Sequence, residues 1–302
     1  MVFLFSIAPG PSFRFSTNLV KDVTKRFLLI LWNSYNYFVT YANLNGFEPG
    51  KTKNQNSILD KWAIIKLQDV VNKVTEDLDN YDLYNATHEI EDFVSRDFSQ
   101  WYIRRSRGRI DSEFLQTLHE ILVTICKLTA PFAPFISEEI YKNLSKEESV
   151  HLSDWPEKKI LGDSDTKILE EMEEVRKVVE KGHALRKEAG IPLRQPLGQF
   201  QISNFKFQIE PYVELLEDEL NIKEVIKGNK IKLDTNITPE LKAEGEMRGL
   251  VRRIQEERKK LGTRLDEKVD VQLPSWPKEF EEEIRKRALV SKITKGEFKV
   301  KR

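Results

Sequence analysis

Four arginines lie within six residues of one another, directly after two aromatic residues, and they are the side chains best suited to bind a ligand. The cluster comprises Trp101, Tyr102, Arg104, Arg105, Arg107 and Arg109. Guanidinium groups pair with phosphates through two parallel hydrogen bonds, and aromatic faces stack on nucleobases. Because the 302-residue chain has no formal net charge, the cluster does not follow from a basic composition. The pattern predicts RNA as the partner.

Packing offers an alternative explanation of the same residues. Trp101 could belong to a helical core, while the arginines pair with nearby acids or lay their stems over apolar surface. The spacing alone leaves both explanations open. Residue type favours the arginines as RNA contacts over Trp101 and Tyr102, since these two aromatics could belong to the core.

Signatures of catalysis are missing from the sequence. It has no phosphate-binding loop of the Gly-x-x-x-x-Gly-Lys type, no Gly-x-Gly-x-x-Gly, no Gly-x-Ser-x-Gly and no His-Glu-x-x-His. Cys126 falls within an apolar helical pattern, which indicates packing, and the four histidines lack the spacing of metal ligands. We therefore expect no catalytic residue and no metal site.

Composition is that of a soluble, globular chain with room for two domains. Hydrophobic residues make up 39% of it and charged residues 32%. There is no apolar run of about 18 residues, and the first eight residues lack the basic start and the apolar length of a secretory signal. We expect a cytoplasmic protein without a membrane partner.

Apolar residues recur at helical spacing through the first half of the chain. The pattern predicts helices over 17–45, 59–78, 86–101, 114–128 and 137–144, separated by breakers such as Gly46, Asn80 and Pro131. Short connections favour an antiparallel bundle. We assign residues 1–156 to this bundle.

A long charged helix and a mixed region follow. Residues 167–189 predict a helix with a narrow apolar stripe, and we assign 157–196 to a linker and bridging helix. Beyond it, alternating apolar residues predict strands between helical segments near 213–220, 243–260 and 278–289. We expect 197–302 to form a small α/β or α+β domain, and we detect no internal repeat. The fold class is therefore mainly α.

Basic residues outnumber acidic ones in the last sixty or so residues. Arg252, Arg253 and Arg258 could attract phosphates, but Glu256 and Glu257 stand at helix-pairing distances and would neutralise much of that charge. RNA contact by this region is left open.

Taken in order, these segments resemble the C-terminal half of isoleucyl-tRNA synthetases, which are class I aminoacyl-tRNA synthetases. In the first half the resemblance rests on FRFS (13–16), LWN (31–33), TYANLNGF (40–47), LDKW (59–62), LDNYD (78–82), IEDFV (90–94), WYIRRSR (101–107), APFAPFISEEIY (130–141) and VHLSDWP (150–156). In the second half it rests on AGIPLRQPL (189–197), ELNIKEV (219–225) and LVRRIQ (250–255). Valyl enzymes share the bundle pattern, but 42–47 and the C-terminal extension favour isoleucine.

The resemblance implies an anticodon-binding bundle that grips the anticodon stem and loop of tRNA(Ile). It implies that ATP and Mg²⁺ serve a catalytic domain outside this sequence, because neither a His-Ile-Gly-His-like nor a Lys-Met-Ser-Lys-Ser-like motif occurs. We expect the chain alone to be inactive, as a fragment, a split subunit or a relic would be. A free-standing tRNA-binding module and a docking subunit for a separate catalytic chain are the alternatives.

Overall fold

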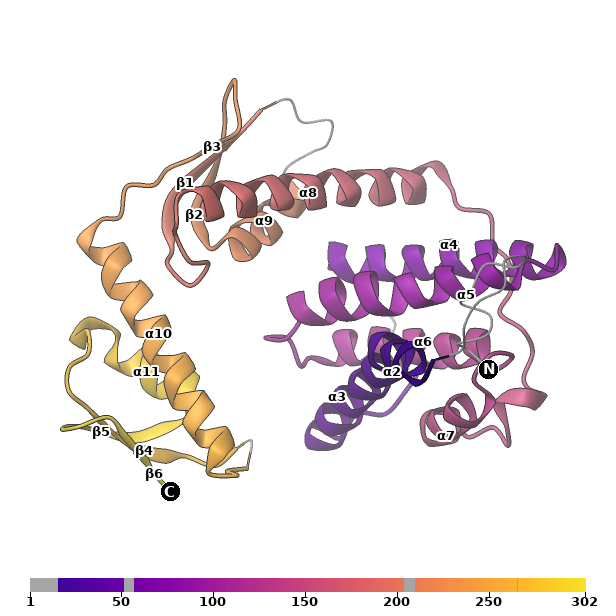
Figure 1. Cartoon of the computed structure of the whole chain (residues 1–302), viewed down its shortest axis with the longest axis horizontal. Coiled ribbons are helices and arrows are strands. Elements are labelled where there is room, and N and C mark those ends of the chain that lie inside the picture. The colour runs from indigo at the N-terminus through magenta and orange to yellow at the C-terminus, as the bar shows by residue number, and fades with distance from the viewer. Residues whose placement is uncertain (1–15, 52–56, 204–209, 265) are drawn as a thin grey trace. The chain divides into compact units, whose positions relative to one another are not determined.

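The chain folds into two compact units, one ending at Met172 and the other running from Glu173 to Arg302 (Figure 1). This computed structural model describes residues 16–51, 57–203, 210–264 and 266–302. The sequence motif at Phe13, Arg14 and Phe15 lies outside the described residues. Each unit has its own core and is described by itself.

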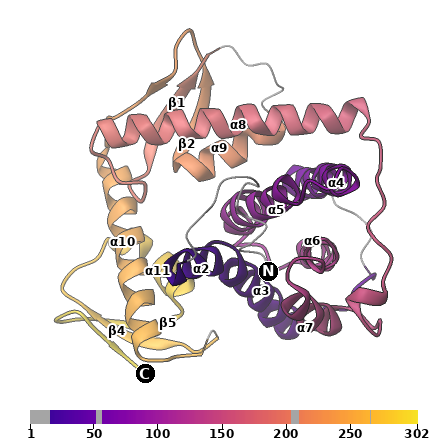
Figure 2. The ribbon, with the colours of Figure 1, turned by 45° about the vertical axis from the view of Figure 1, so that its right-hand side comes forward.

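The first unit is a helical bundle. Its helices are α2 (Thr17–Val23), η1 (Thr24–Leu28), α3 (Leu29–Asn45), α4 (Ile58–Asp79), α5 (Leu83–Asp92), η2 (Phe93–Ile103), α6 (Ser112–Thr129), α7 (Pro134–Leu144) and η3 (Val150–Leu152). Figure 2 shows α3, α4, α5 and α7 grouped around α6. Helix α6 is central because apolar residues occupy most of its circumference, and Phe114, Leu118 and Ile125 are fully buried.

Local sequence sets where these helices begin and end. Side chains of Ser57, Asp82 and Asp111 accept hydrogen bonds from the first free N–H groups of α4, α5 and α6. Helix α3 ends at Gly46, whose φ of 60° is a left-handed conformation that costs glycine little. The predicted helical bundle is confirmed.

Two stretches of the bundle wind as π-helices, which the sequence pattern did not predict. The longer is η2, where we expected the α-helix from residue 86 to continue. In a π-helix hydrogen bonds join residues five apart, so side chains four to five positions apart share a face. The rings of Phe93, Phe98 and Tyr102 follow that spacing and stack in succession, with centroids 6.2 and 6.3 Å apart.

The second unit is an α/β structure with two small sheets. It comprises the end of α8 (Asp163–Glu188), then β1 (Leu197–Ile202), η4 (Glu210–Tyr212), α9 (Val213–Leu220), β2 (Ile222–Lys227), β3 (Lys232–Leu233), α10 (Pro239–Lys260), β4 (Val269–Leu273), η5 (Lys278–Phe280), α11 (Glu281–Ala288), β5 (Val290–Lys295) and β6 (Lys299–Lys301). One sheet has the order β2-β1-β3 and the other β5-β4-β6. The expected small α/β part is confirmed.

The two halves of this unit repeat one another, so the expectation of no internal repeat is wrong. In each half a long helix precedes a central strand, a short helix and two further strands; the central strand pairs parallel with the next and antiparallel with the last. The short helix ends in a left-handed residue, Asn221 in one copy and Leu289 in the other. Each of these residues accepts a hydrogen bond at its carbonyl from the first N–H of the central strand.

A buried arginine occupies the same place in each copy. Arg186 near the end of α8 donates to four main-chain carbonyls, those of Leu220, Asn221, Pro192 and Gln195. Arg258 in α10 donates to the carbonyls of Arg264, Glu267 and Leu289. A left-handed glycine follows each, Gly190 and Gly262, at the same separation. Burial lowers the pKa of Arg186 to about 10, so the side chain stays charged at neutral pH.

Candidate nucleic-acid interface

The arginine cluster lies at the end of η2 and in the turn that leads to α6. Arg107 is exposed, whereas Arg104, Arg105 and Arg109 are partly exposed. The Arg104 Nε donates to the carbonyl of Gln100, 2.7 Å away, which holds its guanidinium against the last turn of the helix. The segment therefore presents positive charge at one end of the bundle.

Trp101 and Tyr102 lie in the core, so neither ring offers a face to a base. Their exposed fractions are 5% and 0%. Both lie at the end of the π-helix η2, where three consecutive residues, Trp101, Tyr102 and Ile103, are buried in the bundle. For these two aromatic residues, the packing explanation of the sequence analysis is therefore the correct one.

Arg109 is also engaged within the protein. Its guanidinium makes two hydrogen bonds, of 2.9 and 2.7 Å, to the carboxylate of Asp60 in α4. The Tyr102 hydroxyl donates to the same carboxylate, and Arg109 also pairs with Asp111, which caps α6. These contacts join α4, η2 and α6. Burial and the neighbouring Asp60 raise the pKa of Tyr102 well above its usual value, so this hydroxyl keeps its proton.

A pair of tyrosines on α3 was missed by the sequence analysis. Tyr37 and Tyr41 are one turn apart on α3, both are partly exposed, and their ring centroids are 4.7 Å apart. Burial and Tyr41 raise the pKa of Tyr37, and the positive charge of Arg107 lowers it. The spacing of four residues within a predicted helix was the available signal.

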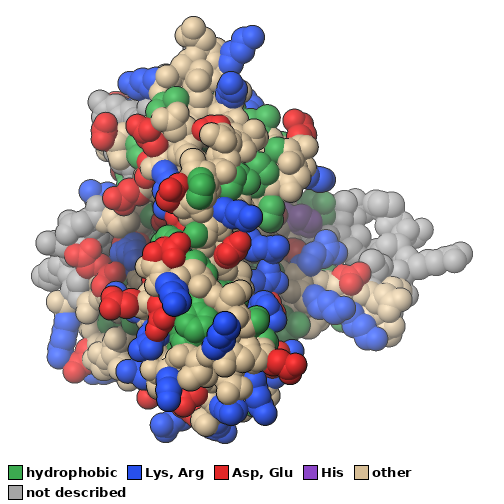
Figure 3. Space-filling view, turned by 90° about the vertical axis from the view of Figure 1, so that its left-hand side faces the viewer, with side chains coloured by type: hydrophobic (Ala, Val, Ile, Leu, Met, Phe, Trp, Pro, Cys, Tyr) green, Lys and Arg blue, Asp and Glu red, His purple; other side chains and the backbone are tan. Residues whose placement is uncertain are grey.

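Charges in the second unit are largely balanced. Arg252 pairs with Glu256, and Arg248 and Lys223 both pair with Glu244. On the side of this unit that faces the viewer in Figure 3, basic and acidic side chains alternate. Its basic residues therefore form no continuous positive surface on that side.

Among the described residues, little points to metal binding, to a reactive thiol or to a membrane-spanning helix. No group of three or more His, Cys, Asp or Glu is placed there to hold a metal ion. Burial raises the pKa of Cys126 to about 12, and its side chain is fully buried, which confirms its packing role. None of the described helices is long and apolar enough to cross a membrane.

Comparison with known proteins places this geometry in a family context. Residues 60–201 match the family model for the anticodon-binding domain of tRNA ligases. Isoleucine–tRNA ligase of Dehalococcoides mccartyi is 34% identical across 97% of this chain and 33% of its own length. That of Clostridium novyi is 39% identical across 82% of this chain and 25% of its own length. For Thermus thermophilus the values are 34%, 83% and 26%. The chain thus spans about a third or less of the relatives it matches.

Proposed function

Since the chain belongs to the isoleucine–tRNA ligase family and matches a C-terminal portion of its members, we propose that it binds tRNA by the anticodon stem and loop. The observation that carries this proposal is the arginine segment, in which Arg107 is exposed and Arg104 and Arg105 are partly exposed, within a bundle that matches the anticodon-binding domain. The names of the relatives favour tRNA(Ile) as the particular tRNA.

Two kinds of contact would hold the RNA. The guanidinium groups of the arginine segment would neutralise backbone phosphates, a contribution that salt weakens strongly. Tyr37 and Tyr41, which are partly exposed on α3, would stack against unpaired loop bases, since single-stranded loops offer bases that aromatic rings can reach. Arg109, Trp101 and Tyr102 would support this surface from behind by fixing the position of η2.

Aminoacylation itself would require a catalytic domain that this sequence does not contain. That domain, on a separate chain or elsewhere on a longer one, would use ATP and Mg²⁺, and the bundle would align the tRNA for it. Such a division of roles fits a chain that spans about a third or less of its relatives.

Binding of a tRNA(Ile) transcript at two salt concentrations tests the proposal. We expect the double variant Arg104→Glu/Arg107→Glu to weaken binding at least tenfold and to reduce its salt dependence, since each lost phosphate contact lowers the slope by about one. Lys158→Glu/Lys159→Glu, in the exposed stretch before α8, is the control of equal charge change. Equal losses in both double variants would contradict a specific role for the arginine segment.

A further inference from the structure

We propose that a cleft in the second unit, between α10 and the segment 274–279, binds one unstacked nucleotide of an RNA strand. The cleft has a volume of about 790 Å³, within the range of sites that hold small organic groups. This inference rests on the proposed function, and it adds a second place on the chain at which RNA is held.

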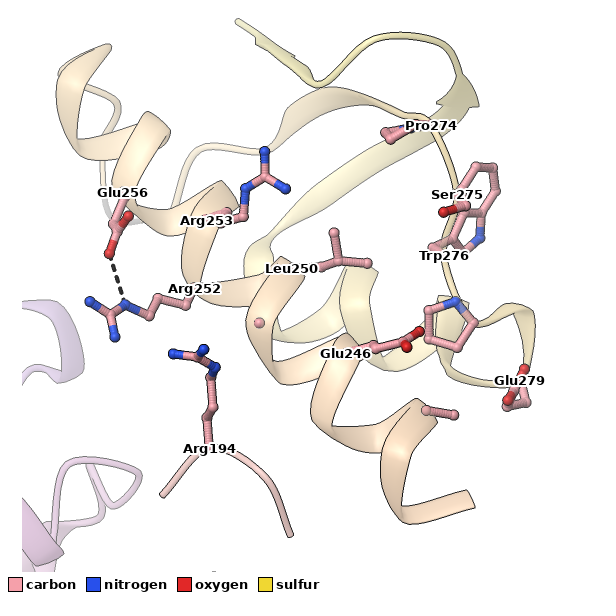
Figure 4. A pocket seen from close by; sticks show the side chains of 13 residues that line it. Arg194, Glu246, Leu250, Arg252, Arg253, Glu256, Pro274, Ser275, Trp276 and Glu279 are labelled. Carbon is pink, nitrogen blue, oxygen red and sulfur yellow. Dashed lines mark hydrogen bonds and ion pairs between the residues drawn. The ribbon is translucent and has the colours of Figure 1, made fainter. Parts of the chain in front are cut away.

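The walls of the cleft suit a nucleobase. On α10, Gly249 leaves a gap in the helix surface, and nothing lies within 4 Å of where a Cβ would stand. Leu250 projects beside it, and Trp276 stands across the cleft (Figure 4). The Trp276 indole N–H donates to Glu281, 2.9 Å away, which holds the ring in place. A flat base would fit between the Gly249 gap and these apolar groups.

Three arginines at the cleft suit the phosphate. Arg194 is exposed, and no ion pair of its side chain is present among the described residues. Arg252 pairs with Glu256 at 2.8 Å, but both groups are more than half exposed, and such pairs are weak enough for a phosphate to displace. Arg253 lies over the ring of Phe298 at 4.1 Å, which fixes its plane.

The loop that carries Arg194 is held rigidly. Buried Arg186 donates to the carbonyls of Pro192 and Gln195 on either side of it. The Gln195 side chain in turn donates to the Leu241 carbonyl at the start of α10, 2.7 Å away. The backbone at Arg194 is thereby held relative to α10, so less of the main chain has to become ordered on binding.

Carboxylates in the cleft distinguish a nucleotide from other anions. Glu246, Glu256 and Glu279 line it together with the arginines. They can accept hydrogen bonds from ribose hydroxyls and from base amino groups, which inorganic anions lack. A nucleotide carries both the anion that the arginines need and the donors that the carboxylates need.

The internal repeat provides a comparison within the same unit. At the positions on α8 equivalent to Gly249 and Arg252, the other copy has Lys177 and Glu180. A long lysine would fill the gap that Gly249 leaves, and a glutamate would repel phosphate. The features of the cleft are therefore particular to the second copy.

The test uses the full chain and a single-stranded RNA hexanucleotide that contains 2-aminopurine, whose fluorescence falls when it stacks on an aromatic ring. We expect saturable quenching by the native chain. Gly249→Leu, which fills the gap, and Arg194→Ala/Arg252→Ala should each weaken binding about tenfold or more. Lys286→Ala/Lys292→Ala, exposed residues that do not line the cleft, should change it less than about twofold. Thermal melting verifies that every variant is folded.

A parallel titration with tRNA(Ile) separates the two proposals. If the native chain binds tRNA and the cleft variants bind both RNAs as the native chain does, the cleft proposal is overturned and the anticodon proposal stands. If the native chain fails to bind tRNA but quenches the hexanucleotide through Gly249 and Arg194, the anticodon proposal fails alone. Competition by polyglutamate as effective as that by unlabelled RNA would indicate attraction to any anion and would overturn nucleotide binding.

Discussion

Arg109 donates two hydrogen bonds to the carboxylate of Asp60, and that carboxylate is completely buried. The last arginine of the cluster is thus part of the scaffold that positions the others. A buried carboxylate that loses its cation is left with an uncompensated charge, which is far more costly than the loss of an exposed pair.

Replacement of Arg109 should therefore destabilise the bundle strongly. We expect Arg109→Ala to lower the free energy of unfolding by about 3 kcal/mol, because the buried Asp60 carboxylate would lose its cation and, among the described residues, would keep the Tyr102 hydroxyl as its side-chain hydrogen-bond donor. Exposed Arg107→Ala should change it by less than about 0.5 kcal/mol. Urea unfolding, monitored by circular dichroism, measures the free energy of unfolding of both variants. Similar values for the two variants would refute a structural role that is particular to Arg109.

Acid should weaken the contact between α7 and η3. The hydrogen bond from Lys142, together with those from Ser149 and the Val150 N–H, lowers the pKa of Glu138 to about 2. A carboxylate whose pKa is lowered in the folded state stabilises the fold at pH values above its pKa in the unfolded chain, which is near 4.5. This contribution is lost as the pH falls toward 2. Glu138→Gln should therefore be less stable than the native chain at pH 7.

The difference between Glu138→Gln and the native chain should shrink steadily between about pH 4.5 and pH 2. Glu139→Gln, on the next residue, serves as the matched control. Unfolding midpoints across this range measure the effect, and a difference that stays constant with pH would show that Glu138 acts by shape rather than charge.

Two glycines within helices should respond in opposite directions to alanine. Nothing lies near the missing Cβ of Gly249, so Gly249→Ala should raise the free energy of unfolding by about 0.5–1 kcal/mol through helix propensity. A Cβ on Gly182 would lie 2.5 Å from the Leu220 side chain, which is fully buried and would have to shift. Gly182→Ala should destabilise the second unit by about 1–3 kcal/mol. Calorimetry of both variants gives the two signs directly.

The tyrosine pair should contribute to RNA binding through its rings. Tyr41→Ala should lower the affinity for tRNA about fivefold or more, and Tyr41→Phe should retain most of it, because stacking needs the ring and not the hydroxyl. Thr40→Ala, at the exposed neighbouring position, is the control. If the phenylalanine variant binds as weakly as the alanine variant, the contact depends on the hydroxyl instead of stacking.

The sequence predicted the helical bundle well because its helices are amphipathic and capped. Apolar spacing located α4 and α6, while Gly46 and Asn80 marked helix ends. The same spacing rule failed at η2, since buried residues there follow the wider interval of a π-helix. The register of that helix decides that Trp101 and Tyr102 face inward.

The repeat in the second unit escaped detection for a different reason. Its two copies share few identical residues, notably the buried arginines Arg186 and Arg258 and the left-handed glycines that follow them. A few other pairs on the long helices are also identical, such as Arg176 and Arg248, but most equivalent positions agree only in being apolar, as Leu216 and Ile284 do, or do not agree at all. A single sequence does not distinguish such agreement from ordinary core composition, but strand pairing reveals it.

Side-chain partners explain the remaining differences in the candidate site. Spacing gives no information about which arginine meets a carboxylate from another helix, so Arg109 and Arg107 looked alike in the sequence. The partner of Arg109 lies on α4, far away along the chain, and only the tertiary structure brings it close.

The most direct test of the central claim is the affinity of the full chain for tRNA(Ile), compared with the same tRNA carrying a changed anticodon, at low and at physiological salt. Anticodon recognition predicts tight, salt-sensitive binding to tRNA(Ile) that falls at least tenfold when the anticodon is changed. Equal affinity for the two tRNAs at both salt concentrations would contradict it.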